Sequence, residues 1–204
     1  MGLDFDSIMK MPVTGQAIAH AIEDGRQWGQ TFLSDSHWCN DRDRMANQVI
    51  FESTLWSVGN GIGNGLLGIA GIPTDIAITL YSQVKLSSTL FTIYGINITS
   101  RATQPLVLAA AAGVTLSELA NCLGTHAATQ AIQKVLMSIP SRTFAEVNKA
   151  LGIKIISKAG EKTLLNVAKI MPGIGSIVSG TVNGVMMNAC GHSIIAFIKA
   201  WKRS

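Results

Sequence analysis

The sequence predicts an all-α fold, and two observations carry this prediction. Apolar residues recur at intervals of three and four, as in the segment from Ile76 to Tyr94. Glycine and proline separate such segments, and strand-like alternation is confined to short runs such as the ambiguous "QVIFESTLW". The chain of 204 residues has the length of one domain. We therefore expect a single compact helical domain of about six to eight helices, two of them glycine-rich and closely packed.

The N-terminal segment differs in charge from the rest of the chain. Residues 1–53 carry eight acidic and four basic side chains, a net charge of −4, whereas the remainder carries four acidic and twelve basic ones, a net charge of +8. One amphipathic helix is expected at about residues 16–32. We interpret residues 1–44 as an acidic N-terminal extension and residues 45–204 as the main helical domain.

Local signals mark the bounds of the next helix. Pro73 precedes an apolar segment with helical spacing, and Thr74 or Asp75 can cap its start. Gly95 can end the same helix, because glycine adopts the left-handed conformation that follows many helix C-termini. The sequence therefore predicts one helix between Pro73 and Gly95.

The second half of the chain is divided by further glycines and prolines. A unit between Pro105 and Pro140 has possible breaks at Gly113 and Gly124, which predict either two helices or one kinked helix. A lysine-rich helix and a final apolar helix over residues 175–204 follow.

The composition leaves little charge to cover an ordinary soluble surface. The chain is 48% hydrophobic and 14% charged, whereas soluble domains average about 25% charged residues. Residues 54–72 and 170–198 contain no Lys, Arg, Asp or Glu, but glycine and small polar residues dilute both segments. A spanning helix needs about 20 predominantly apolar residues. We therefore expect buried or peripherally inserting helices rather than stable transmembrane spans.

The glycine-rich segment does not predict a nucleotide site. Gly63, Gly65 and Gly68 match the GxGxxG spacing, but no βαβ pattern surrounds them. The next acidic residue, Asp75, follows too closely to bind a ribose, and no GK[ST] motif marks a P-loop. We expect no nucleotide cofactor.

Helix packing accounts better for these glycines. One glycine face lies in the glycine-rich segment, and a second lies near the other end of the chain. The residues are Gly61, Gly65 and Gly68 in the first face and Gly173, Gly180 and Gly184 in the second. Because each glycine destabilises a helix by about 1 kcal/mol relative to alanine, several in one helix favour a close contact. The two faces are expected to pack on each other or to insert together into a membrane.

A ridge of lysines marks the helix before this final segment. Its members, Lys154, Lys158, Lys162 and Lys169, lie within about 80° of one another at 100° per residue, roughly opposite the apolar side chains. The ridge is either an ordinary solvated helix face or a surface that binds anionic lipid headgroups. Nucleic acid is not expected as a partner, because the ridge has no interleaved aromatic or arginine side chains.

No motif predicts catalysis or metal binding. Cys39, Cys122 and Cys190 fit no CxxC spacing and favour a reducing compartment. Cys122 and His126 have the spacing of two metal ligands on a helix, but a site needs three or four. No GxSxG motif is present. We expect no metal and no cofactor, and an enzymatic activity has no positive support in the sequence.

Asp75, Lys85 and Tyr94 form a candidate polar site. Asp75 is the sole carboxylate between Glu52 and Glu118, and the helix that it opens also carries Lys85 and Tyr94. Such groups can supply the polar contacts of a concave ligand site. Alternatively, Asp75 caps the helix, where its charge meets the exposed amides and the positive end of the helix dipole.

The order of these features resembles the EcsC family. The resemblance rests on "GIPTDIAITLYSQVKLSSTLFTIYGIN" and "LGIKIISKAGEKTLLNVAKIMPGIGSIVSGTVNGVMMNACGHSIIAFIKAW", and it covers about residues 45–200. The family-like positions are Gly61, Gly65, Pro73, Asp75, Tyr94, Gly95, Lys158, Pro172, Gly173 and Gly175. The resemblance implies a bacterial α-helical protein associated with membranes. The family is named for a protein encoded beside an ABC transporter. It implies no catalytic mechanism.

Three functions follow as alternatives. The first is a noncatalytic helical protein that docks on membrane lipid or on a membrane protein such as a transporter, at a cytoplasmic, peripheral or partly inserted position. The second is a membrane-inserting or permeabilising protein that uses the glycine-faced helices. The third is an enzyme or a binder of a small apolar ligand, with a pocket near Asp75 and Tyr94. The N-terminus lacks the pattern of a secretory signal, and the sequence indicates no oligomeric state.

Overall fold

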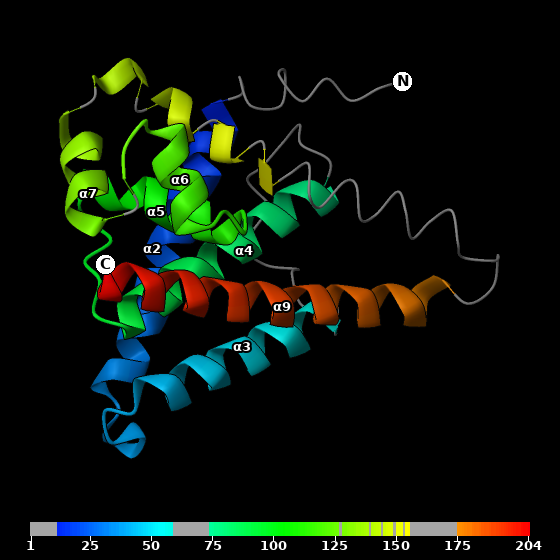
Figure 1. Cartoon of the computed structure of the whole chain (residues 1–204). Helices are drawn as coiled ribbons and strands as arrows, with labels where there is room; N and C mark the ends of the chain where they lie inside the picture. Colours follow the sequence, from blue (N-terminus) through cyan, green and yellow to red (C-terminus); the bar gives the residue numbers. More distant parts are fainter. Residues whose placement is uncertain are drawn as a thin grey trace, which may run out of the picture.

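A computed structural model describes residues 12–58, 74–126, 128–138, 140–143, 145–148, 150–152, 154–155 and 175–204 of the protein. Every regular element within these ranges is a helix, which confirms the predicted all-α fold (Figure 1). The labelled elements are α2 (Pro12–Ser34), η1 (Ser36–Trp38), α3 (Arg42–Val58), α4 (Thr74–Ile93), η2 (Arg101–Thr103), α5 (Gln104–Ala111), α6 (Leu116–Cys122), α7 (Thr129–Ser138) and α9 (Gly175–Arg203). The ambiguous run "QVIFESTLW" belongs to α3 and is helical.

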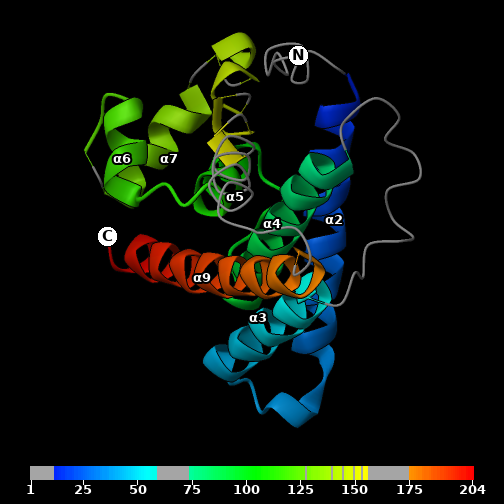
Figure 2. The same ribbon diagram turned by 90° about the vertical axis from the view of Figure 1, so that its right-hand side faces the viewer.

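Helix α4 forms the centre of the fold. It packs against α2, α3, α5 and α9, and Figure 2 shows it lying beside α2. Residues 86–94 are all buried. The serine and threonine hydroxyls among them donate to backbone carbonyls; for example, Ser87 Oγ donates to Val107 O at 2.9 Å and Thr92 Oγ1 donates to Ser88 O at 2.9 Å. The polar side chains of this buried helix are thus satisfied without water.

Two glycines allow α2 to approach α4 closely. A Cβ atom at Gly25 would lie 2.4 Å from the Lys85 carbonyl oxygen and 2.6 Å from Ser88 Cβ. At Gly29, a Cβ atom would lie 2.7 Å from Thr92 Cβ. Gly25 and Gly29 thus form a GxxxG face, the feature that the sequence predicted at other glycines.

The contact of α2 with α4 changes the predicted division of the chain. The acidic N-terminal helix is packed into the helical body, and the predicted boundary at residue 44 falls inside α3. A change in net charge along the sequence reports the solvated faces of helices. It does not mark where packing begins, so α2 belongs with the elements that follow it.

The predicted end of α4 at Gly95 is confirmed. Gly95 has a φ of 78°, which L-residues with a Cβ rarely adopt. Its amide donates to Thr92 O at 2.9 Å, and the amide of Ile96 donates to Phe91 O at 2.9 Å. These two bonds satisfy carbonyls at the end of the helix in the manner of a Schellman motif.

The described residues between Gln104 and Ser138 contain three helices, α5, α6 and α7, where the sequence predicted two helices or one kinked helix. The breaks lie at the predicted positions, since Gly113 and Gly124 each have a φ of 64°. The additional start is at Thr115, whose side chain forms a reciprocal capping box with Glu118 at the beginning of α6.

Helices α3 and α9 pack antiparallel along one side of the molecule (Figure 1). Buried residues recur on α9 at intervals of three and four: Gly184, Met187, Gly191, Ile194, Ile198 and Trp201. This spacing is that of a helix with one continuous packed face. A Cβ atom at Gly191 would lie 2.5 Å from Ile50 Cγ1 of α3. We call the part of this pair beyond that contact, residues 51–58 and 175–190, the arm.

Candidate functional site

The predicted glycine faces fall largely outside the described residues, which do not include Gly61, Gly65, Gly68 or Gly173. Gly180 and Gly184 lie in α9, and Gly184 is buried there. The expected contact between the two glycine faces therefore stays a prediction. Within the described residues, the close glycine contacts are made by Gly25 and Gly29 on α2 and by Gly191 on α9.

The lysine ridge is described at one position only. Lys154 is exposed within a short helical stretch, whereas Lys158, Lys162 and Lys169 lie outside the described residues. The exposure of Lys154 agrees with either interpretation of the ridge, as a solvated face or as a surface for anionic headgroups.

The structure does not bring Asp75, Lys85 and Tyr94 together. Asp75 lies in the first turn of α4 and Tyr94 directly follows its last residue. At 1.5 Å per residue the helix separates their backbones by roughly 28 Å. Lys85 faces α2 instead, where its Nζ lies 5.4 Å from the centre of the Trp28 ring. Lys85 therefore forms a cation–π contact inside the α2–α4 interface.

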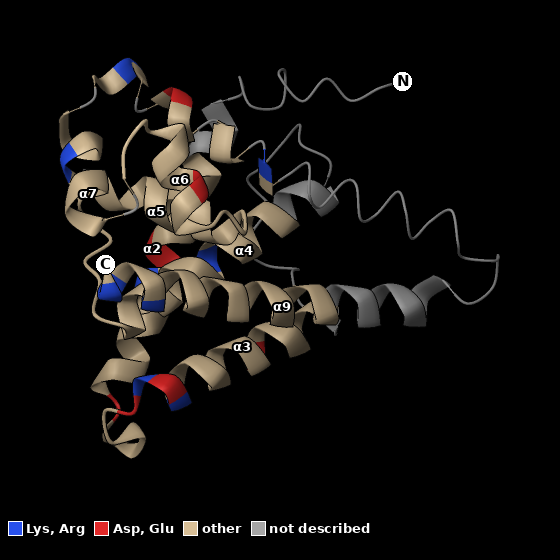
Figure 3. Ribbon diagram, viewed as in Figure 1, with Lys and Arg blue, Asp and Glu red and all other residues tan. Residues whose placement is uncertain are grey.

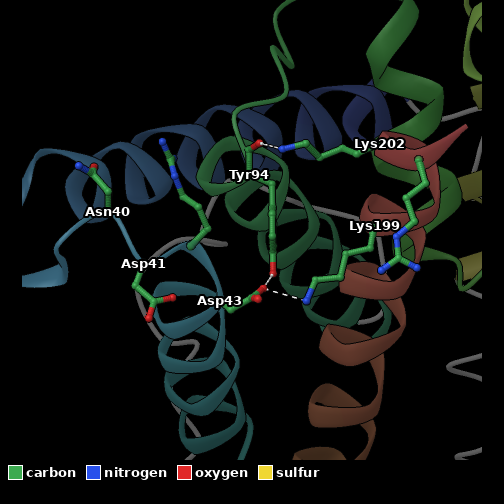
Figure 4. Close-up of a pocket in the computed structure, with 8 residues that line it drawn as sticks. Asn40, Asp41, Asp43, Tyr94, Lys199 and Lys202 are labelled. Atoms are coloured by element: carbon green, nitrogen blue, oxygen red, sulfur yellow. Dashed lines mark hydrogen bonds and ion pairs between the residues drawn. The ribbon is translucent and has the colours of Figure 1, made fainter.

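Tyr94 lines a polar pocket where three helices meet (Figure 4). The pocket is open to solvent, has a volume of about 610 Å³, and lies at the start of α3 and the ends of α4 and α9. Its lining residues are Asn40, Asp41, Arg42, Asp43, Tyr94, Lys199, Lys202 and Arg203. Six of these eight are charged, whereas sites for small apolar ligands are lined mainly by hydrophobic side chains. The apolar-ligand site near Tyr94 stays a prediction.

Asp43 connects the three helices in this pocket. Its carboxylate accepts a hydrogen bond from the Tyr94 hydroxyl and an ion-paired contact at 2.9 Å from Lys199 Nζ. The bond from Tyr94 and the one from Lys199 lower the pKa of Asp43. The pKa of Tyr94 is raised above its ordinary value of 10.0, because burial disfavours the phenolate and the hydroxyl donates to a carboxylate.

Two cations of the pocket cover the carbonyl end of α4. Arg42 donates from its guanidinium to the Ile93 carbonyl, and Lys202 Nζ donates to the Tyr94 carbonyl at 3.2 Å. Cations are stabilised at this position, because the C-terminal end of a helix carries partial negative charge. At the start of α3, Asp41 Oδ1 accepts the amide of Arg44 at 2.9 Å and so caps that helix.

Sequence reasoning missed this pocket. Asp43, Tyr94 and Lys199 come from three helices distant in the chain, and no local pattern relates them. The local signals were weaker ones: an acidic residue at the start of one helix, and basic residues in the last turn of another. Both patterns are ordinary complements of a helix dipole and do not indicate that the two ends meet.

A second surface feature lies on the arm. Four large apolar side chains there are more than half exposed: Phe51 (55%), Leu55 (53%), Trp56 (61%) and Val185 (66%). Trp56 and Val185 each lie six residues from the Gly191–Ile50 contact, so the antiparallel helices place them at the same level. We call these four residues the apolar patch.

The arm carries almost no charge. Figure 3 shows charged residues at the start of α3 and the end of α9, while the described part of the arm is almost wholly uncharged. Glu52 is the one charged residue in the arm's sequence. The α3–α9 pair is thus divided between a charged end that holds the pocket and an apolar end that holds the patch.

Comparisons with protein-family models, with characterised proteins and with solved structures yield no match to this chain. The resemblance to the EcsC family therefore stays a prediction. Among the described residues, no helix combines the length and apolar character needed to cross a membrane. Within the same ranges, no three His, Cys, Asp or Glu side chains are grouped as a metal site requires.

Proposed function

We propose that the protein is a noncatalytic helical protein that docks peripherally on an anionic membrane surface through α3 and the arm. The observation that supports this function is the apolar patch, where Phe51, Leu55 and Trp56 are each more than half exposed. Large apolar side chains exposed on a surface that carries little charge, here the single carboxylate of Glu52, are typical of an interaction site. The pocket that contains Tyr94 gives no comparable support to an enzyme or to an apolar-ligand binder.

The arrangement of α3 favours lipid as the occupant of this surface. Phe51 and Leu55 follow Arg44 by seven and eleven residues and therefore share its helix face. The guanidinium of Arg44 lies 5.4 Å from the centre of the Trp38 ring. On a membrane surface, the apolar side chains of this face would enter the acyl boundary while Arg44 meets lipid phosphates. Aromatic side chains such as Trp56 are enriched at the same depth.

The charge of the whole chain supports an anionic surface over a neutral one. The formal net charge is +4, and the pocket end of the α3–α9 pair contributes several of the basic groups. Juxtamembrane Lys and Arg each contribute about 1 kcal/mol near an anionic leaflet. Binding is therefore expected to weaken in high salt, while the apolar patch keeps part of it salt-resistant.

Vesicle flotation tests this function. The full-length protein is floated with phosphatidylcholine vesicles that contain or lack phosphatidylglycerol, at low and high salt. We expect binding to the anionic vesicles, and at least a tenfold loss of affinity in the variant that combines Phe51→Ser with Trp56→Ser. Met137→Ser is the matched control, since Met137 is 68% exposed but lies on α7. It is expected to leave affinity unchanged.

Four results would overturn the proposal, and the first three concern binding. One is that the protein floats with none of the vesicles. Another is that Met137→Ser loses as much affinity as the patch variant. The third is a concentration-dependent dimer in sedimentation that the patch variant abolishes without any vesicle binding, which would assign the patch to a second copy of the chain. Dye leakage from the same vesicles would replace docking with the permeabilising function.

A further inference from the structure

The charges of the pocket are not balanced by its carboxylates. Arg42, Lys199, Lys202 and Arg203 carry four positive charges, whereas Asp41 and Asp43 carry two negative ones. Asp43 is paired with Lys199 at 2.9 Å. The hydrogen bonds that Arg42 and Lys202 make go to carbonyl oxygens, which satisfy donors but do not neutralise a full charge. The lining therefore has a formal excess of two positive charges.

Several hydrogen-bond donors remain directed at the open space. The side chain of Arg203 makes no hydrogen bond or ion pair with any other part of the chain that the structure describes, and it is exposed at the pocket. Lys199 and Lys202 each have three ammonium hydrogens and use one in the contacts described. Figure 4 shows Lys199 and Lys202 reaching the pocket from α9, opposite Asp43 at the start of α3. An incoming anion thus finds unused donors on the α9 side of the pocket.

The start of α3 also favours an anion in the pocket. Asn40, Asp41, Arg42 and Asp43 form one wall, and the positive end of the helix dipole lies there. The opposing negative end of α4 is already covered by Arg42 and Lys202. Both effects favour a negative ligand over a neutral one, and the open volume of about 610 Å³ admits a small headgroup or metabolite-sized group.

We propose that this pocket binds a phosphate monoester. Such a group carries about −1.5 to −2 charge at neutral pH and three acceptor oxygens, which match the excess charge and the unused donors. The chemistry is shared by a soluble phosphate monoester and by a lipid whose headgroup ends in one. The proposal does not depend on membrane docking, because the apolar patch and the pocket lie at opposite ends of the α3–α9 pair.

Isothermal titration calorimetry of the full-length protein with glycerol phosphate at low salt tests the pocket. We expect saturable binding, a weakening of at least tenfold in Arg203→Gln, and less than a twofold change in Arg142→Gln. Arg142 is the matched control, because its side chain is 93% exposed and pairs only with Glu146 at 3.5 Å among the described residues. Both variants remove one positive charge from the molecule.

A variant with the opposite sign separates binding from structural damage. Asp43→Asn removes a negative charge from the pocket and releases Lys199, so it is expected to tighten glycerol phosphate binding several-fold although it loosens the contact between helices. A purely structural role for these residues predicts no such gain. No saturable binding by the wild-type protein, or equal weakening in Arg203→Gln and Arg142→Gln, would overturn the proposal.

Vesicle flotation then shows whether the phosphate monoester belongs to a lipid or to a soluble molecule. The protein is floated with two kinds of vesicle that carry equal negative charge. One contains phosphatidic acid, whose headgroup is a phosphate monoester, and the other contains phosphatidylglycerol, whose headgroup is a phosphate diester. If the protein prefers phosphatidic acid and Arg203→Gln abolishes this preference, the pocket binds a lipid headgroup. Binding of glycerol phosphate without that preference assigns it to a soluble ligand. In both cases the pocket variants distinguish this site from the apolar patch, whose variants retain glycerol phosphate binding.

Discussion

Single glycine positions set how closely the helices of this protein approach each other. At Gly25 the nearest atom to an added Cβ is the backbone oxygen of Lys85, at 2.4 Å. A flexible side chain can rotate away from such a contact, but a carbonyl oxygen within a helix cannot. Relief therefore requires α2 and α4 to move apart, which would loosen the packing of the buried centre of the fold.

Gly25→Ala is accordingly expected to destabilise the protein by about 1–3 kcal/mol. Helix propensity alone predicts the opposite sign, since alanine favours a helix over glycine by about 1 kcal/mol. Urea unfolding followed by circular dichroism measures the difference. Gln30→Ala, at an exposed position of the same helix, serves as the control and should change stability little. A higher urea midpoint for Gly25→Ala would show that the helices are not in close contact.

The hydroxyls of both tyrosines are held by carboxylates from other helices. The chain has two tyrosines, and Tyr81 donates to Asp24 as Tyr94 donates to Asp43. For both, burial and the carboxylate partner raise the pKa above 10.0. Because the folded pKa exceeds the unfolded one, the stabilisation is fully present below pH 10 and is lost as the pH rises through the folded pKa.

Alkaline titration of tyrosinate absorbance tests this arrangement. In the folded protein both tyrosines are expected to ionise at higher pH than in the urea-unfolded chain. Asp43→Asn should bring the pKa of Tyr94 back toward its ordinary value and leave Tyr81 unchanged, since Tyr81 is bonded to Asp24. If the folded and unfolded proteins titrate together, the two hydroxyls are not held as described.

At the scale of elements, α3 and α9 are joined by a contact between a glycine and a branched side chain. Gly191 faces Ile50, and its added Cβ would meet Cγ1, Cδ1 and Cγ2 of that residue within 3.1 Å. These are side-chain atoms, so the conflict can be removed by truncating Ile50. The pair therefore allows the contact between the two helices to be measured directly.

A double-mutant cycle makes that measurement. Gly191→Ala alone is expected to destabilise the protein by about 1–3 kcal/mol through overpacking. In the Ile50→Ala background, where a cavity is already present, the same substitution should destabilise it much less. Chemical unfolding of the wild-type protein, the two single variants and the double variant gives the coupling free energy between Gly191 and Ile50. Strict additivity would place Gly191 and Ile50 out of contact.

The sequence predicted elements better than it predicted their meeting points. Helix ends at Gly95, Gly113 and Gly124 follow from local backbone chemistry, and all three glycines have positive φ. The division of the segment after Pro105 into three helices was missed because a capping box adds a start within a short span. The pocket was missed for a different reason: Asp43 and Lys199 are joined only by tertiary packing. Periodicity carries no information about such pairs.

At the scale of the whole molecule, charge and apolar exposure are separated along one pair of helices. The pocket gathers six charged residues at one end of the α3–α9 pair, and the apolar patch occupies the other. Composition alone predicted too little charge for an ordinary surface, and the structure locates part of that deficit on the arm. Substitutions in the apolar patch are therefore expected to remove docking and to leave the lining of the pocket unchanged.

The pairing of α3 with α9 also has a consequence for biosynthesis. Gly191 is made 191 − 50 = 141 residues after its partner Ile50. At about 10 residues per second, the interval on a ribosome is on the order of ten seconds. Until α9 arrives, α3 presents apolar residues on its future packed face as well as on the patch. A nascent chain in that state is a natural client for chaperones, and its yield in cells is expected to depend on them more than the stability of the finished fold would indicate.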